Sequence, residues 1–172
     1  MSIKRALFLD RDGVINQDLG YVYKPEDCHF MDGVDPLLQA AKAKDYLIII
    51  ITNQAGIGRG YYTEEGFHQF MGWMNEQLHH QIDAVYFCPF HAEHGIGKYK
   101  QHSLDRKPEP GMLLKAFEDH GIDPGQSLMI GDREKDMMAA SKAGISTELF
   151  FSDQSLPDCI SIASLKEALP YL

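Results

Sequence analysis

The amino-acid sequence predicts an α/β fold built on a doubly wound, mainly parallel β-sheet. Short aliphatic runs recur along the chain without alternating apolar and polar residues, which is typical of strands buried on both faces. Segments with helical periodicity separate these runs, so strand and helix alternate and right-handed crossovers are expected. The runs cover residues 6–9, 47–51, 84–87, 128–130 and 147–151.

The first two helices are predicted from their start signals. Asp35 followed by Pro36 indicates a side-chain N-cap with proline at the first helical position, and this helix is expected to end near Lys44. A second helix is expected after Thr63. Its apolar stripe is typical of core packing and consists of Phe67, Phe70, Met71, Met74 and Leu78.

Two further helices follow in the second half of the chain. One is expected after Pro110 and ends at Gly121, where glycine suits a left-handed C-cap. The other is expected after Asp132 and ends near Gly144. No segment between the predicted strands is long enough for a large cap domain, so we expect one domain over residues 1–172.

The composition excludes several classes of function. A net charge of −9 disfavours a nucleic-acid partner, which needs a continuous basic surface. The longest aliphatic run, residues 47–51, is far below the ~20 residues that cross a bilayer, and the N-terminus does not resemble a secretion signal. Three cysteines at unrelated spacings fit reduced thiols better than disulfides. We therefore expect a cytoplasmic monomer without membrane or nucleic-acid partners.

Polar residues follow the predicted strands directly, which is where ligands bind in a doubly wound sheet. Asp10 and Asp12 end the first strand, and Gly13 allows the chain to turn sharply there. Two carboxylates so close together repel unless a cation lies between them. Asp132 is the natural third ligand, and an all-oxygen set of this kind suits Mg²⁺.

A phosphate group would complete this site. Lys107 can balance the phosphate charge, and Thr52 can donate its hydroxyl to a phosphate oxygen. One aspartate would then be free to attack phosphorus, and the other could protonate the leaving oxygen and later deprotonate water. Asn53 and Gln54 add amide donors near Thr52.

The motifs "DRDG", "TNQ", "RKP" and "GDREKD" resemble, in order, the four motifs of the haloacid dehalogenase superfamily of phosphohydrolases. The resemblance implies that Asp10 is the nucleophile and Asp12 the general acid/base. It also implies that Thr52 and Lys107 stabilise the phosphoryl group, while Asp132 binds Mg²⁺. In that superfamily the residue matching Asp12 reaches the metal through its backbone carbonyl.

Three further stretches, "INQDLGYVYKPED", "TNQAGIGRGYYTEEGF" and "RKPEPGM", resemble the D-glycero-D-manno-heptose 1,7-bisphosphate 7-phosphatase branch. The resemblance implies hydrolysis of the 7-phosphate of a small sugar bisphosphate, in the supply of activated heptose for a surface glycan. Its substrate-facing turn matches Asp18, Gly20 and Tyr21. Arg106 and Arg133 could grip the second phosphate, because guanidinium binds phosphate through two parallel hydrogen bonds.

The chain departs from this branch where zinc-bearing members hold their loop with Cys-x-His and Cys-x-Cys. The four positions are occupied here by Cys88, Phe90, Ser103 and Asp105, so three ligands are missing and structural zinc is expected to be absent. A replacement site is conceivable from the loop's other candidate ligands: Cys88, His91, His94 and His102.

Two alternative functions remain open from the sequence. The first is a histidinol-phosphate phosphatase or another small phosphomonoesterase, against which the turn at Gly20 and Tyr21 argues. The second is a phospho-receiver signalling domain, which also combines clustered carboxylates, a threonine and a lysine. A late Gly-Asp motif such as "GDREKD" is not expected in a receiver.

Overall fold

The computed structural model describes residues 3–172, and its centre is a six-stranded sheet in which every pair of neighbouring strands is parallel. The strand order is β3-β2-β1-β4-β5-β6. The strands are β1 (Arg5–Leu9), β2 (Tyr46–Asn53), β3 (Ala84–Cys88), β4 (Leu128–Gly131), β5 (Thr147–Phe151) and β6 (Ile160–Ile162). The structure thus confirms the predicted α/β class with a mainly parallel sheet.

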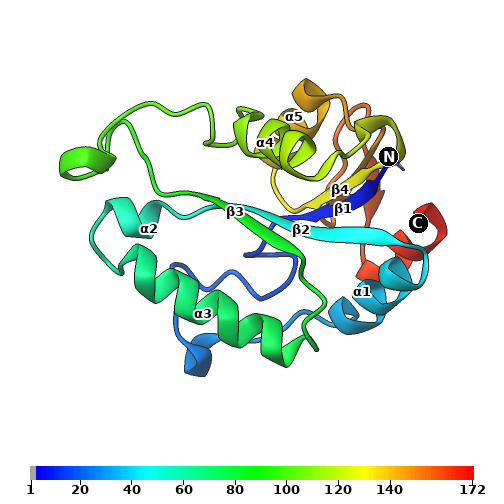
Figure 1. Ribbon diagram of the computed structural model, residues 1–172, viewed down its shortest axis with the longest axis horizontal. Helices are drawn as coiled ribbons and strands as arrows, with labels where there is room; N and C mark the ends of the chain where they lie inside the picture. The colour runs from blue at the N-terminus through cyan, green and yellow to red at the C-terminus, as the bar shows by residue number, and fades with distance from the viewer. Residues whose placement is uncertain (1–2) are drawn as a thin grey trace.

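Helices cover both faces of this sheet (Figure 1). Helices α1 (Val34–Ala43) and α3 (Glu64–Gln77) pack on one face, and α4 (Gly111–His120) and α5 (Glu134–Ala143) pack on the other. Side chains at successive positions of β1 enter opposite cores, since Leu7 joins the α1/α3 side and Phe8 the α4/α5 side. Burial on both faces explains why the strands read as unbroken aliphatic runs.

Shorter helical segments complete the fold. One is the four-residue helix α2 (Ala55–Gly58), which directly follows β2. The others are the 3₁₀ segments η1 (Pro25–Asp27), η2 (Gly97–Tyr99), η3 (Pro124–Gln126) and η4 (Leu165–Tyr171). None of the described connections between strands forms a large cap, as the sequence predicts. No helix in residues 3–172 is both long and apolar enough to span a bilayer.

The helix boundaries agree with the sequence predictions at most ends. Thr63 caps α3 by accepting a hydrogen bond from the backbone of Gly66, and Gly121 ends α4 in the left-handed region. The predicted start of α1 is wrong. The helix begins at Val34 with Gly33 as N-cap, so Asp35 lies in its first turn and accepts a hydrogen bond from Gln39.

The strand order places β1 at the switch point of the sheet, because β2 and β3 are added on one side of β1 and β4 to β6 on the other. The connections that contain α1 and α3 build outward through β2 to β3, whereas those that contain α4 and α5 build through β4 to β5. Ligands bind at such a switch point, beyond the carboxyl ends of the strands. Leu9, at the end of β1, pairs with both Ile50 and Ile130, and β2 and β4 continue beyond these residues to Asn53 and Gly131. The residues just beyond Leu9, Ile50 and Ile130 are therefore neighbours.

Candidate active site

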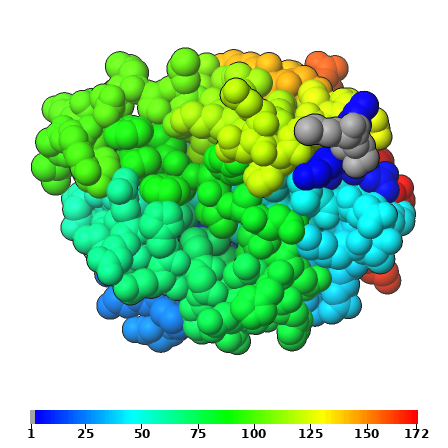
Figure 2. All heavy atoms as spheres, viewed as in Figure 1, coloured from blue at the N-terminus to red at the C-terminus, as the bar shows by residue number. Residues whose placement is uncertain are grey.

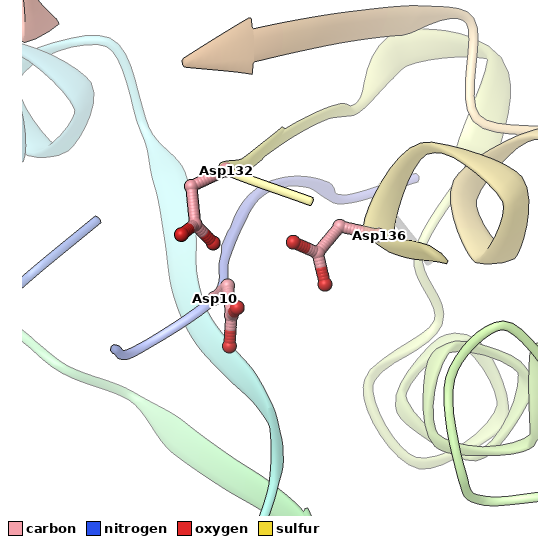
Figure 3. A group of neighbouring side chains, drawn as sticks. All are labelled: Asp10, Asp132 and Asp136. Carbon is pink, nitrogen blue, oxygen red and sulfur yellow. The ribbon is translucent and has the colours of Figure 1, made fainter. Parts of the chain in front are cut away.

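Three carboxylates meet at the carboxyl end of the central strands. Asp10 follows β1, Asp132 follows β4 and Asp136 lies in the first turn of α5 (Figure 3). One carboxylate oxygen from each lies within 4.8 Å of the others. Burial raises the pKa of Asp10, and the charge of Asp136 raises it further. Burial and Asp136 likewise raise the pKa of Asp132. The cluster therefore favours a bound cation.

Lys107 is the cation that the chain itself supplies to this cluster. Its Nζ lies 2.7 Å from Asp136 Oδ1 and 3.0 Å from Asp10 Oδ1, and it donates to the carbonyl oxygen of Ile51 at 2.8 Å. The residue is only 2% exposed. Burial alone would lower the lysine pKa, but the attraction of Asp10 and Asp136 outweighs it and raises the pKa overall. Lys107 stays charged, and its position is fixed by three contacts.

Asn53 holds the main chain of Lys107. The Asn53 amide nitrogen donates to the Lys107 carbonyl at 3.1 Å, and its Oδ1 accepts from the Lys107 backbone N–H at 3.0 Å. Both ends of the side-chain amide are therefore committed to the loop that carries the lysine. The residue thus orients Lys107, and its predicted contact with the substrate stays a prediction.

The carboxylate of Asp12 lies outside the acidic cluster. Its Oδ1 forms an ion pair with Arg11 Nη2 at 2.7 Å, and it also accepts from Arg11 Nε at 3.3 Å and Asn16 Nδ2 at 3.1 Å. The cation beside this carboxylate is thus Arg11, which corrects the electrostatic argument that Asp10 and Asp12 share one metal through their side chains. A metal contact through the Asp12 backbone carbonyl remains a prediction.

Thr52 and Gln54 lie behind Asp12. Gln54 Nε2 donates to Thr52 Oγ1 at 2.8 Å and to Asp12 Oδ2 at 3.2 Å, and Gln54 Oε1 accepts from the Tyr62 hydroxyl. Gln54 is only 2% exposed, and both ends of its amide are engaged. Its amide thus supports two catalytic candidates, Asp12 and Thr52, and its predicted contact with the substrate stays a prediction.

Gly13 provides the sharp turn that the sequence predicts after Asp12. Its φ of +88° lies in the left-handed region. A Cβ at this position would also lie 2.1 Å from Asp132 Oδ2. Both the backbone conformation and the close approach of Asp132 therefore require glycine.

The segment 18–21 and Arg133 meet at the exposed edge of the site. Arg133 Nη2 donates to Asp18 Oδ2 at 3.0 Å, and its Nε lies 3.4 Å from Asp132 Oδ2. Asp18 Oδ1 accepts from the backbone of Gly20, and Tyr21, with a φ of 53°, is 45% exposed. Three of the predicted substrate-binding residues thus lie on one turn, and Arg133 links that turn to the acidic cluster.

Arg106 lies on the loop between β3 and Lys107. Its Nη1 donates to the carbonyl of Phe90 at 3.3 Å, and the Ile96 backbone N–H donates to the carbonyl of Gly58 at 2.8 Å. In Figure 2 this loop, bright green, forms a continuous surface beside the teal residues around α2. Hydrogen bonds and packing against α2 therefore position the loop.

Within the described residues, 3–172, the candidate replacement ligands of this loop form no group of three, although the rings of His91 and His94 lie 4.6 Å apart. Cys88 is buried, whereas His91 Nδ1 accepts backbone hydrogen bonds from Glu93 and His94. At two of the branch's zinc positions, Ser103 accepts from the Asp105 backbone and Asp105 pairs with Lys115. Among residues 3–172, the carboxylates of Asp10, Asp132 and Asp136 form the one group with metal-ligand spacing.

The acidic cluster has the donor chemistry that Mg²⁺ needs. Its ligands are all oxygen atoms, and Asp132 Oδ1 is buried without a hydrogen-bond partner in the structure. Three carboxylates face one lysine, which leaves negative charge in excess. The residues that line this site therefore fit a divalent cation.

Three residues at this centre are absent from the sequence-predicted set. Asp136 stands at the end of "GDREKD", four residues after Asp132 at a helix start, and that spacing is the signal that could have identified it. Arg11 and Asn16 left no comparable signal. Their side chains meet Asp12 only because the turn after β1 folds back on itself.

Comparisons with known proteins agree with this geometry. A family model described as HAD-hydrolase-like matches residues 104–160. A Burkholderia mallei protein named D-glycero-alpha-D-manno-heptose-1,7-bisphosphate 7-phosphatase is 49% identical, covering 98% of this chain and 93% of its own. A Vibrio cholerae protein named for the beta anomer is 46% identical, covering 85% of this chain and 80% of its own.

Two solved structures are similar over nearly the whole chain. A HAD-like protein from Mesorhizobium loti is 30% identical, with a TM-score of 0.89, and covers 98% of this chain and 86% of its own. The D,D-heptose 1,7-bisphosphate phosphatase of B. bronchiseptica, complexed with magnesium and phosphate, is 24% identical, with a TM-score of 0.82, and covers 96% of each chain. The second likeness concerns the fold alone.

Proposed function

Because this chain belongs to the D-glycero-D-manno-heptose 1,7-bisphosphate 7-phosphatase family of HAD-like hydrolases, we propose that it hydrolyses the 7-phosphate of that sugar bisphosphate. The product would enter the supply of activated heptose for a surface glycan. The observation that carries the proposal is the placement of Lys107 Nζ, 3.0 Å from Asp10 Oδ1 at the end of β1 and beside the acidic cluster. A phosphoryl group bound next to Asp10 would meet a nucleophile and a fixed positive charge together.

Asp10 is the nucleophile of this reaction. A carboxylate oxygen of Asp10 forms a bond to phosphorus as the bond to the leaving sugar oxygen breaks, which gives an aspartyl phosphate. Lys107 offsets charge on the phosphoryl oxygens, and the Thr52 hydroxyl donates to one of them. The phosphate is then released when water attacks the intermediate and the Asp10 carboxylate leaves.

Asp12 moves the protons. It gives a proton to the departing sugar oxygen in the first step and takes one from the attacking water in the second. Its Oδ1 already accepts from Arg11 Nε, Arg11 Nη2 and Asn16, so the transferred proton is carried by Oδ2. The partners of Oδ1 therefore select the oxygen that does the acid–base work.

Asp10 and Asp132 would hold Mg²⁺ in this proposal, together with the backbone carbonyl of Asp12, while Asp136 holds Lys107. The bound ion would supply electrostatic stabilisation of charge on the phosphoryl oxygens. The unpartnered Oδ1 of Asp132 supports this assignment.

The sugar and its second phosphate are recognised at the rim. Asp18, Gly20 and Tyr21 face the sugar hydroxyls, and Arg106 and Arg133 bind the anomeric phosphate. Arg133 forms ion pairs with Asp18 and Asp132. When substrate binds, its ion pair with Asp18 would be replaced by one with the anomeric phosphate. This exchange would couple substrate binding to the position of the Asp18 turn.

Steady-state kinetics tests the substrate. Both anomers of heptose 1,7-bisphosphate are compared with histidinol phosphate, since the relatives' names divide between the alpha and beta anomers. A kcat/KM that favours a heptose anomer by about 100-fold or more supports the proposal. A preference for histidinol phosphate would overturn the substrate assignment and favour the alternative phosphatase. Because the chain belongs to a family of phosphatases, the alternative that it is a phospho-receiver domain is wrong.

We further propose that the chain acts as a single-domain cytoplasmic monomer without structural zinc. The hydrogen bonds of Phe90 and Ser103 support a loop that needs no metal. Elemental analysis of the purified protein and light scattering after size exclusion test these points. One zinc ion per chain would contradict the first, and a dimer mass would contradict the second.

A further inference from the structure

A tyrosine outside the catalytic set is connected to it by one side chain. The Tyr62 hydroxyl donates to Gln54 Oε1 at 2.5 Å, while Gln54 Nε2 contacts Asp12 Oδ2 and Thr52 Oγ1. The Tyr62 ring belongs to the core on the α1/α3 side and stacks on Tyr23 at a centroid distance of 4.6 Å. Packing of the Tyr62 ring therefore fixes the position of its hydroxyl independently of the hydrogen bond to Gln54.

The hydrogen-bond partners fix which way the Gln54 amide faces. The NH₂ group of Gln54 faces Asp12 Oδ2 and Thr52 Oγ1, and its carbonyl oxygen accepts from the Tyr62 hydroxyl, so these three partners together fix the orientation of the amide. Burial raises the pKa of Tyr62, which keeps the phenol protonated and able to donate. Thr52 Oγ1 then accepts from Gln54, and the hydroxyl hydrogen of Thr52 stays available for a phosphoryl oxygen.

We propose that Tyr62 is a positioning residue for the reaction, which acts through Gln54 to orient the proton-carrying oxygen of Asp12 and the hydroxyl of Thr52. This inference rests on the proposed phosphatase function. Without the phenol hydroxyl, the Gln54 amide is free to turn over. Its carbonyl oxygen would then face Asp12, where it would accept the hydrogen bond of the proton that the leaving group needs, and would also accept the Thr52 hydrogen that the phosphoryl group needs.

The leaving group distinguishes this role from a general effect on folding. A sugar alkoxide is strongly basic and needs the proton of Asp12, whereas 4-nitrophenolate is weakly basic and leaves without one. Misplacing Asp12 should therefore slow hydrolysis of the sugar phosphate more than hydrolysis of 4-nitrophenyl phosphate. Damage to the fold would lower both rates together.

The test compares Y62F with wild type and with Y23F, which removes a hydroxyl from the neighbouring stacked ring. For Y62F we expect kcat/KM on heptose bisphosphate to fall about tenfold, the effect of about 1.4 kcal/mol of transition-state stabilisation. The loss on 4-nitrophenyl phosphate should be at least about fivefold smaller, because the acid step then matters less. Y23F should match wild type.

A double-mutant cycle tests whether the effect passes through Gln54. Once Gln54 is replaced in Q54L, adding Y62F should change kcat/KM by less than about twofold. Wild-type rates in Y62F, equal losses on both esters, or a full additional loss in Q54L/Y62F would each overturn the inference. Wild-type inactivity on heptose bisphosphate with turnover of histidinol phosphate would overturn the proposed substrate alone, and the comparison then uses histidinol phosphate.

Discussion

Asn53 grips the backbone of Lys107 with both ends of its side-chain amide, although the two residues are 54 positions apart in the chain. Asn53 ends β2, and Lys107 lies on the loop that returns from β3 to the start of α4. This pair of hydrogen bonds joins Lys107, the lysine proposed to bind the phosphoryl group, to the end of β2 in the central sheet. It gives the site a support that does not depend on a metal in the loop.

Replacing Asn53 should show how much the position of Lys107 contributes to kcat, because the substitution leaves the lysine charge in place. In N53A both hydrogen bonds are lost, and we expect kcat to fall about tenfold or more because the lysine loop moves. N53D keeps the acceptor for the Lys107 N–H and loses the donor, so its loss should be smaller. Phosphate release measured for both variants checks this order, and an N53A enzyme with wild-type kcat would contradict it.

Asp10→Asn should abolish turnover while the fold survives. The amide cannot form the acyl phosphate, so we expect kcat to fall by at least about 10³-fold. Because the wild-type carboxylate is buried beside Asp136, D10N should unfold at a temperature no lower than wild type. D119N, an exposed substitution on α4, is the matched control and should keep its activity. Turnover by D10N would refute the nucleophile assignment.

Magnesium should stabilise the fold in a pH-dependent way. Burial and neighbouring acids raise the folded-state pKa of Asp10 and Asp132. The metal-free folded protein therefore binds these protons more tightly than the unfolded chain does, and the stability gained in this way is lost as pH rises through the folded-state pKa values. We expect Mg²⁺ at about ten times its Kd to raise Tm by about 2–6 °C at pH 7.5 and by less at pH 5. D132N should lose this response, and an unchanged response would contradict the site.

Cys159 should react slowly with alkylating reagents. Burial, the hydrogen bond to Glu148 and its charge together raise the pKa of the thiol to about 11. A pKa two units above the ordinary value of 9.0 leaves about a hundredfold less thiolate at pH 8. Mass spectrometry of iodoacetamide adducts should show this lag, and E148Q should shorten it. A rate equal to that of free cysteine would contradict the raised pKa.

The sequence predicts the strands and the strand-end residues because both depend on local pattern. The five aliphatic runs become β1 to β5, and Asp10, Thr52 and Asp132 lie near one another because parallel strands end at one edge. Strand β6 escapes prediction because it has only three residues and two of them are exposed. Its parallel pairing with β5, a long-range contact, defines it as a strand.

The orientation of side chains in the site depends on contacts that no local pattern reveals. Asn53 and Gln54 are neighbours after the same strand, yet one faces the Lys107 loop and the other faces Asp12 and Tyr62. Their partners arrive from elsewhere in the chain. The donor chemistry of these residues is therefore predictable, whereas their targets are not.

Arg11 connects the chemistry to the hydrophobic core. Its guanidinium is fully buried, pairs with Asp12 and lies over the ring of Phe70 at 5.1 Å from the centroid. The same charge is thus part of both the acid–base apparatus and the packing of α3 against the sheet. A substitution in α3 that moves Phe70 would therefore also move the cation beside Asp12, and it should alter catalysis in a protein that still folds.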